Sequence, residues 1–161
     1  MSEAIQERIM QSARSWIGTP YMHAHALKGA QGGCDCLGLI RGVYKEVYGL
    51  SEDPEKVPNY TPTWRDFCMD DPLKKVCAKY FDPVEAGSWR SYLATRDAHT
   101  NIILFRMSPD MAAKHCAIVS RPGRGRTLGD MIHAYSLHDV CETPLSIWWI
   151  DKIAGVYKWR Q

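Results

Sequence analysis

Cys36 is the residue of this sequence best suited to nucleophilic chemistry. It follows Gly32 and Gly33 and opens a stretch, Cys36 to Tyr48, whose apolar residues have helical spacing. Its thiol is therefore expected in the first turn of a helix, with Asp35 as the N-cap. Unpaired backbone N–H groups and the helix dipole favour a thiolate there, whereas the Asp35 carboxylate disfavours one. A base is needed to complete the activation; from this segment alone, an ordinary buried cysteine is an equally good interpretation.

Two histidines could supply that base and its partner. His115 and His133 each lie in a short segment rich in β-branched or aromatic residues, and two adjacent strands could bring them side by side. A cysteine nucleophile, a histidine base and a third polar group that orients the histidine are the components of a cysteine acyl-transfer site. A single histidine in a strand is more often structural, but the combination with Cys36 favours catalysis.

The elements that must position these residues form two blocks. Helices are expected over residues 2–16, over 36–48 and from Pro72 onward, and short strands over 102–106, 115–120, 131–136, 140–143 and 153–159. Helices followed by an antiparallel meander predict an α+β fold. Residues 50–98 are rich in proline, and apart from the helix at Pro72 we interpret them as an irregular surface insertion. The chain, residues 1–161, is expected to form a single domain.

Composition excludes several classes of function. The 161 residues include 20 Lys and Arg against 18 Asp and Glu, a net charge of +2 that is too balanced for a dedicated nucleic-acid binder. No stretch approaches the roughly 20 apolar residues of a membrane span, so no membrane insertion is expected. The start, Met1 to Arg8, lacks the pattern of a secretory signal, which predicts synthesis in the cytoplasm without a signal peptide. The six cysteines are then expected as free thiols.

Four segments resemble the motifs of the NlpC-type cell-wall cysteine peptidases. Trp-Ile-Gly-Thr-Pro-Tyr at 16–21 and Gly-Cys-Asp-Cys-Leu-Gly-Leu-Ile at 33–40 are similar to the catalytic signature. His-Cys-Ala-Ile at 115–118 and Ile-His-Ala at 132–134 are similar to the two later motifs. The likeness covers nearly the whole chain and is least clear in its proline-rich middle.

The resemblance implies a papain-like core, with the N-terminal helices packed on an antiparallel sheet, and a role for each site residue. Cys36 would be the nucleophile, His115 the general base and His133 the residue that orients His115. Tyr21 would place its hydroxyl near the oxyanion, beside the backbone N–H of Cys36, and Asp35 would belong to the same oxyanion and substrate-binding region. For Tyr21, packing after a proline turn is the alternative. The implied reaction is hydrolysis of an amide in the peptide stem of peptidoglycan, around D-glutamate, with no metal and no cofactor.

Further segments resemble the branch of this family that is encoded with phage tails and gene-transfer agents. They cover residues 103–106, 113–115, 140–146, 148–149 and 153–157. The resemblance implies a component of a phage-like tail, with tail hub or tip proteins as partners, that breaches the host cell wall during DNA delivery. Three departures leave the cleaved bond open: Leu37 replaces a serine that helps to bind the substrate amine, Thr100-Asn101 replaces Gly-Asp, and Cys116-Ala117 replaces a glycine.

Two other functions compete with this one. The first is a structural zinc site, because soft ligands are numerous, although Cys-x-Cys is a poor match to zinc spacing. Its ligands would come from Cys34, Cys36, His115, Cys116, His133, His138 and Cys141. The second is a non-catalytic tail component that retains the fold. The other five cysteines, Cys34, Cys68, Cys77, Cys116 and Cys141, are interpreted as buried apolar residues or as residues that take no part in the reaction.

Several conspicuous residues have no assigned role. Trp148 and Trp149 could form an interface patch, a sugar-stacking platform or, as we favour, core packing beneath the last strand. A basic hairpin tip, with arginines at 121, 124 and 126, is most simply a solvated turn. His23 and His25 follow Tyr21 closely and are candidates for lining a cleft.

Overall fold

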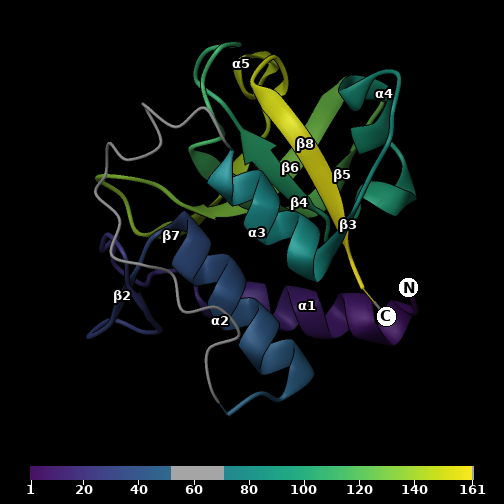
Figure 1. Ribbon diagram of the computed structural model, residues 1–161. Helices are drawn as coiled ribbons and strands as arrows, with labels where there is room; N and C mark the ends of the chain where they lie inside the picture. Colours follow the sequence, from purple (N-terminus) through teal and green to yellow (C-terminus); the bar gives the residue numbers. More distant parts are fainter. Residues whose placement is uncertain (52–70, 161) are drawn as a thin grey trace.

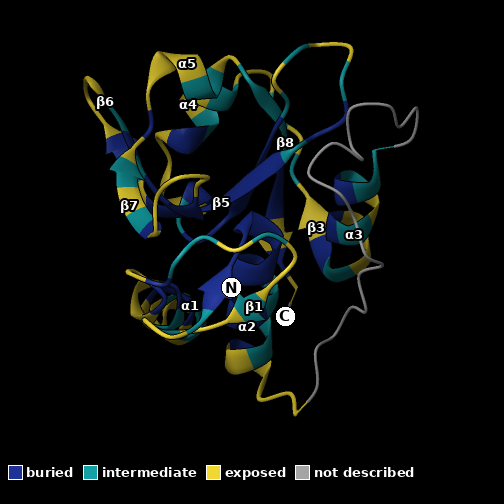
Figure 2. Ribbon diagram, turned by 90° about the vertical axis from the view of Figure 1, so that its left-hand side faces the viewer, coloured by how far each residue is buried: buried dark blue, intermediate teal, exposed yellow. Residues whose placement is uncertain are grey.

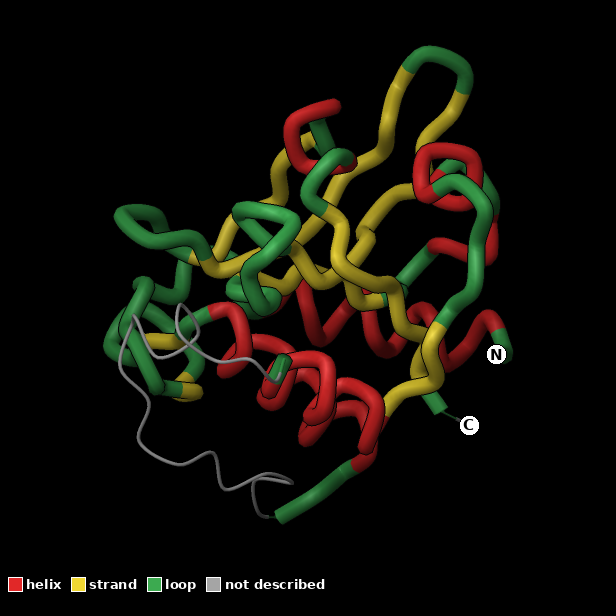
Figure 3. The backbone as a smooth tube through the Cα atoms, turned by 45° about the horizontal axis from the view of Figure 1, so that its top comes forward, coloured by secondary structure: helices red, strands yellow, loops and turns green. Residues whose placement is uncertain are grey.

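A six-stranded antiparallel sheet forms the centre of the molecule, in a computed structural model that describes residues 1–51 and 71–160 (Figure 1). The strand order is β3-β8-β4-β5-β6-β7. The strands are β3 (Phe81–Pro83), β4 (Ile102–Phe105), β5 (His115–Arg124), β6 (Thr127–Ala134), β7 (Val140–Pro144) and β8 (Ile153–Trp159). Helices lie on both sides of this sheet, and the two ends of the chain lie near each other (Figures 1 and 3).

Two amphipathic helices build the N-terminal part. Helix α1 (Glu3–Ser15) begins at the N-cap Ser2, and α2 (Cys36–Tyr48) begins at Asp35 and ends at Gly49, whose φ of 64° is the left-handed conformation typical of a glycine C-cap. A Cβ atom at Gly42 would overlap the indole ring of Trp16, so this glycine permits the close packing of α1 on α2. The predicted bounds of α2 and both of its caps are confirmed, and α1 is one residue shorter at each end than predicted.

Side chains of the central strands alternate between two hydrophobic clusters. In β4, Ile102 and Leu104 join a cluster with α1, α2 and α3 (Pro72–Tyr80), whereas Ile103 and Phe105 join a cluster on the opposite face. The opposite face is covered by α4 (Trp89–Leu93) and α5 (Ile147–Ile150). Because successive strand residues point to opposite faces, burial on both faces requires the continuous apolar run of β4. Figure 2 shows β5 and part of β8 in the dark blue of buried residues.

The interpretation of residues 50–98 as irregular apart from one helix is wrong for most of its described part. Besides α3, which has Pro72 at its first position as predicted, this part contains β3, α4 and a short 3-10 helix at Arg96–Ala98. Phe81 and Leu93 are 3% and 1% exposed, so the segment adds an edge strand and core residues rather than a surface excursion. The sequence did not reveal this because β3 is only three residues long and ends in a proline.

The strand order also departs from a simple meander. Strands β4 to β7 pair consecutively, but β8 returns across the sheet and inserts between β3 and β4. A separate two-stranded sheet, β1 (Ala26–Leu27) with β2 (Gly33–Cys34), precedes α2. Among the described residues, no helix has the length and apolar character needed to cross a membrane.

Candidate active site

The Cys36 thiol lies where the start of α2 meets the start of β5. Its side chain is 6% exposed, and its Sγ atom lies 4.0 Å from the backbone oxygen of Lys114, the residue that precedes His115. The first-turn position predicted for Cys36 is therefore confirmed, with the helix dipole directed as that prediction requires. The structure also brings the thiol beside the strand that carries the first candidate histidine.

The Asp35 carboxylate fixes the loop in front of this helix. Its Oδ1 atom accepts a hydrogen bond from Gly38 N at 2.8 Å, the N-cap bond, and its Oδ2 atom accepts one from Ala24 N at 3.0 Å. His23 Nδ1 lies 3.7 Å from the same Oδ2. Asp35 is 2% exposed, so its two oxygens satisfy buried donors on two segments and hold the loop against α2.

Gly38 allows that loop to approach the helix closely. A Cβ atom at this position would overlap the carbonyl oxygen of His25, which itself accepts a hydrogen bond from Asp35 N. His25 therefore takes part through its backbone, and its Nδ1 atom lies 2.8 Å from the carbonyl oxygen of His23. Tyr21 lies at the start of this loop, forms a bridge to Cys34 and packs partly buried against the helical cluster. Both interpretations of Tyr21 are compatible with this placement.

His115 and His133 lie side by side, as the sequence predicted for adjacent strands. His115 Nε2 is 2.9 Å from His133 Nδ1, and the side chains are 7% and 3% exposed. His133 Nε2 is in turn 3.0 Å from the hydroxyl oxygen of Thr143 on β7. The three side chains form one hydrogen-bonded chain across β5, β6 and β7.

The His133 imidazole is held neutral by its surroundings. Burial lowers its pKa from 6.5 to about 4, repulsion from His115 and His138 adds to the effect, and the Cys36 thiolate opposes it. At neutral pH the His133 ring therefore carries one proton. That single N–H can serve only one of its two partners as a donor, so Thr143 and His115 must take complementary roles.

Two further residues complete the surroundings of the histidines: Thr143, which the sequence analysis did not single out, and Trp149, which it named without placing it beside them. The ring centroid of Trp149 lies 5.4 Å from that of His115 and 5.8 Å from that of His133. Trp149 also packs in the cluster beneath β8, as favoured for core packing, whereas Trp148 is 51% exposed. Because His133 pairs with Cys141, Thr143, two residues further along β7, lies on the same face of the sheet as His133. Only the strand register reveals this relation.

The described cysteines are all free thiols. Cys34, Cys36, Cys77 and Cys116 are buried and Cys141 is partly buried, while Cys68 lies outside the described residues. Burial raises the pKa of Cys34 and of Cys77 to about 12, so these two are chemically inert at neutral pH. Within residues 1–51 and 71–160, no three His, Cys, Asp or Glu side chains are grouped so that they could hold a metal ion.

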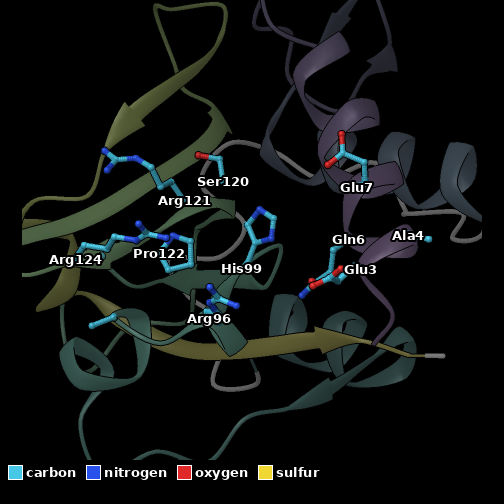
Figure 4. Close-up of a pocket in the computed structure, with 12 residues that line it drawn as sticks. Glu3, Ala4, Gln6, Glu7, Arg96, His99, Ser120, Arg121, Pro122 and Arg124 are labelled. Atoms are coloured by element: carbon cyan, nitrogen blue, oxygen red, sulfur yellow. The ribbon is translucent and has the colours of Figure 1, made fainter.

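Two cavities differ in their relation to the histidines. One of about 350 Å³ is lined by His133 and Thr143 together with residues of α5. The other, about 1170 Å³, lies between α1 and the β5–β6 hairpin, with Glu3 and Glu7 on one wall and Arg96 and Arg124 opposite (Figure 4). None of the five predicted site residues lines the larger cavity, so its size does not make it the reaction centre.

Comparison with known proteins identifies the fold. No protein-family model and no curated protein sequence matches this chain. Among solved structures, NlpC2 from Trichomonas vaginalis is similar over 100% of this chain and 49% of its own, with a TM-score of 0.62 and 16% identity. An NLP/P60 family protein, described as similar to lipoprotein, from Staphylococcus aureus is similar over 100% of this chain and 43% of its own, with a TM-score of 0.56 and 19% identity. The fold is that of NlpC/P60 proteins.

This NlpC/P60 fold confirms the predicted papain-like α+β class. The chain spans less than half the length of those two NlpC/P60 neighbours. It matches an N-acetylmuramoyl-L-alanine amidase from Bacteroides uniformis over 98% of this chain and 100% of that one, with a TM-score of 0.56 and 12% identity.

Proposed function

We propose that this protein is a cysteine peptidase that hydrolyses amide bonds in the peptide stem of peptidoglycan. One observation carries the proposal: a cysteine at the start of α2 lies against the strand of His115, whose Nε2 atom is 2.9 Å from His133. A nucleophile, a base and a group that orients the base are the minimum set for acyl transfer through a thioester.

The contacts of the two histidines are compatible with an arrangement of protons that suits catalysis. His115 Nε2 is engaged with His133, so Nδ1 is the nitrogen that serves as the base towards Cys36. Nδ1 is free of a proton when His115 Nε2–H donates to His133 Nδ1 and His133 Nε2–H donates to the Thr143 oxygen. In the proposed arrangement Thr143 accepts the His133 N–H, and His133 accepts the His115 N–H.

The reaction then follows in two steps. His115 takes the thiol proton, and Cys36 sulfur attacks the amide carbon; the same proton passes to the amine as the carbon–nitrogen bond breaks, leaving a thioester. Water attacks the thioester carbon, gives one proton to His115 and releases the acid, and the thiol is restored. The backbone N–H of Cys36 and the Tyr21 hydroxyl are the proposed oxyanion donors, each worth roughly 2.7–4 kcal/mol in the transition state.

The substrate class is supported by the structural neighbours and by the sequence motifs. The neighbours include NlpC/P60 proteins and a protein named an N-acetylmuramoyl-L-alanine amidase, an activity on peptidoglycan stems. The resemblance of residues 16–40, 115–118 and 132–134 to NlpC-type motifs favours the same class, with cleavage around D-glutamate.

We further propose that the peptidase is carried in a phage-like tail and acts at the host wall during DNA delivery. This part is supported by the sequence resemblance of residues 103–106, 140–146 and 153–157 alone. Mass spectrometry of purified particles tests it: the chain should copurify with tail hub or tip proteins, and its absence from the particles would exclude the tail.

The enzymatic proposal is tested by incubating purified sacculi with the wild type and with Cys36→Ala and comparing the released products by mass spectrometry. We expect new stem-peptide fragments from the wild type only, and their masses identify the cleaved bond. Identical product profiles would overturn the proposal and favour a non-catalytic tail component.

A further inference from the structure

The 350 Å³ cavity beside His133 has walls that the hydrolytic mechanism does not use. It lies between β6, β7 and α5, and Tyr135, His138, Pro144, Trp148 and Trp149 surround His133 and Thr143 there. Its volume falls within the range of small-molecule sites, roughly 300–1,000 Å³. It is therefore large enough for one ring-sized group next to the reaction centre.

Aromatic side chains shape this cavity and are exposed there. Trp148 is 51% exposed and Tyr135 is 40% exposed, although large aromatic rings are usually more fully buried. The Trp148 and Trp149 rings meet at 83° with centroids 4.7 Å apart, and the Lys152 ammonium lies 4.5 Å from the Trp148 ring centroid. These contacts favour the observed orientation of the Trp148 ring.

The remaining lining residues, His133, His138, Cys141, Thr143 and Pro144, carry no permanent charge. Among the described residues that line the cavity there is no Asp, Glu, Lys or Arg, and the low pKa of His133 keeps that ring neutral. The Thr143 hydroxyl and the His138 ring offer hydrogen bonds. The nearest permanent charge identified beside these walls is the Lys152 ammonium at the Trp148 ring. A neutral ligand with apolar faces and hydrogen-bonding edges fits them, and a pyranose ring has that composition.

We propose that this cavity binds a sugar ring of the glycan strand to which the stem peptide is attached. The identity of the glycan rests on the proposed function, but sugar binding itself does not require catalysis. His133 both lines the cavity and bonds to His115, so a sugar bound there lies beside the reaction centre. Two extended residues span about 7 Å, so a short stem could join the sugar to a scissile amide.

The test uses the Cys36→Ala chain, in which no turnover occurs, titrated with tri-N-acetylchitotriose and followed by NMR of the tryptophan indole N–H signals. We expect saturable shifts for Trp148 and Trp149, with a Kd on the order of 1 mM. Trp148→Ala and, independently, Tyr135→Ala should each weaken binding about tenfold. Ile147→Ala is the matched control: Ile147 is 60% exposed on the same helix and does not line this cavity.

Either of two results would overturn the inference: no shift of these indole signals, or an affinity that Trp148→Ala leaves unchanged. In the active chain, Trp148→Ala should also reduce the preference for a disaccharide-linked over a free stem peptide about tenfold through KM; an unchanged preference would contradict the inference. Failure of the proposed peptidase function can be told apart from failure of this inference, because the protein would then still bind the sugar but would not digest sacculi.

Discussion

His115 and His133 occupy diagonal positions on the same face of neighbouring antiparallel strands, and their Nε2 and Nδ1 atoms are 2.9 Å apart. The register that pairs Ile118 with Ile132 places His133 opposite Ala117, two residues from His115. Diagonal neighbours of this kind are within reach of ring-sized side chains. The hydrogen bond therefore depends on the strand register, and a slip by one residue would turn one histidine to the other face.

The first prediction concerns the unequal roles of the two histidines. His115→Ala should lower kcat/KM on stem-peptide substrates by 10²-fold or more, because it removes the base. His133→Ala should cost about 10–100-fold, the value of a hydrogen bond to a group that becomes charged. Cys77→Ala removes a buried thiol that is not one of the proposed catalytic residues Cys36, His115 and His133, and it should retain activity. An equal loss in both histidine variants would contradict the assignment of base and orienting residue.

Thr143 provides a second prediction. Thr143→Val removes the hydroxyl that lies 3.0 Å from His133 Nε2 and keeps the side-chain shape, so kcat should fall about 5- to 10-fold as His133 loses its preferred tautomer. Thr143→Ser keeps the hydroxyl and should keep most of the activity. Steady-state kinetics of both variants show whether the Thr143 hydroxyl contributes to catalysis. If Thr143→Val were as active as Thr143→Ser, the hydroxyl would have no role in orienting His133.

The lowered pKa of His133 predicts an acid-dependent loss of stability. Because this pKa is about 4 in the folded protein against 6.5 for an unperturbed histidine, the unfolded chain binds more protons between those values. The contribution is fully present above pH 6.5 and is lost progressively towards pH 4, by up to roughly 3 kcal/mol. Urea unfolding at pH 7 and pH 4.5 measures the free energy of unfolding. His133→Gln, which cannot titrate, should lose less stability than the wild type over this range; parallel losses would refute the prediction.

Gly38 yields a matched pair of substitutions. Gly38→Ala places a Cβ atom against the His25 carbonyl oxygen, so the loop held by Asp35 must move; we expect about 1–3 kcal/mol of destabilisation and reduced cleavage. Gly87→Ala is the control, because a Cβ atom there meets nothing within 4 Å. Thermal unfolding and cleavage assays measure both effects: Gly38→Ala should unfold at a lower temperature and cleave more slowly than Gly87→Ala. If both alanine variants behave alike, the close approach at Gly38 has no functional consequence.

Local features of the sequence were sufficient to predict the bounds and caps of several helices and strands, including the helix that carries Cys36. The helix at Cys36–Tyr48, its Asp35 and Gly49 caps, and Pro72 at the start of α3 follow from short-range geometry, and the structure confirms them. The strand of Ile153–Trp159 was also predicted with its observed bounds. By contrast, β3 was missed, since its existence depends on pairing with β8, more than 70 residues further along the chain.

The sequence by itself determined which residues can react, a cysteine at a helix start and two strand histidines, and which aspartate caps that helix. These properties depend on residue type and on neighbours within a few positions. Only the tertiary structure decided that His115 bonds to His133, that Thr143 completes the chain, and that Trp148 and Tyr135 border a neutral cavity beside them. Those relations depend on strand register and on the position of α5, because side chains far apart in the sequence meet only when the sheet has formed.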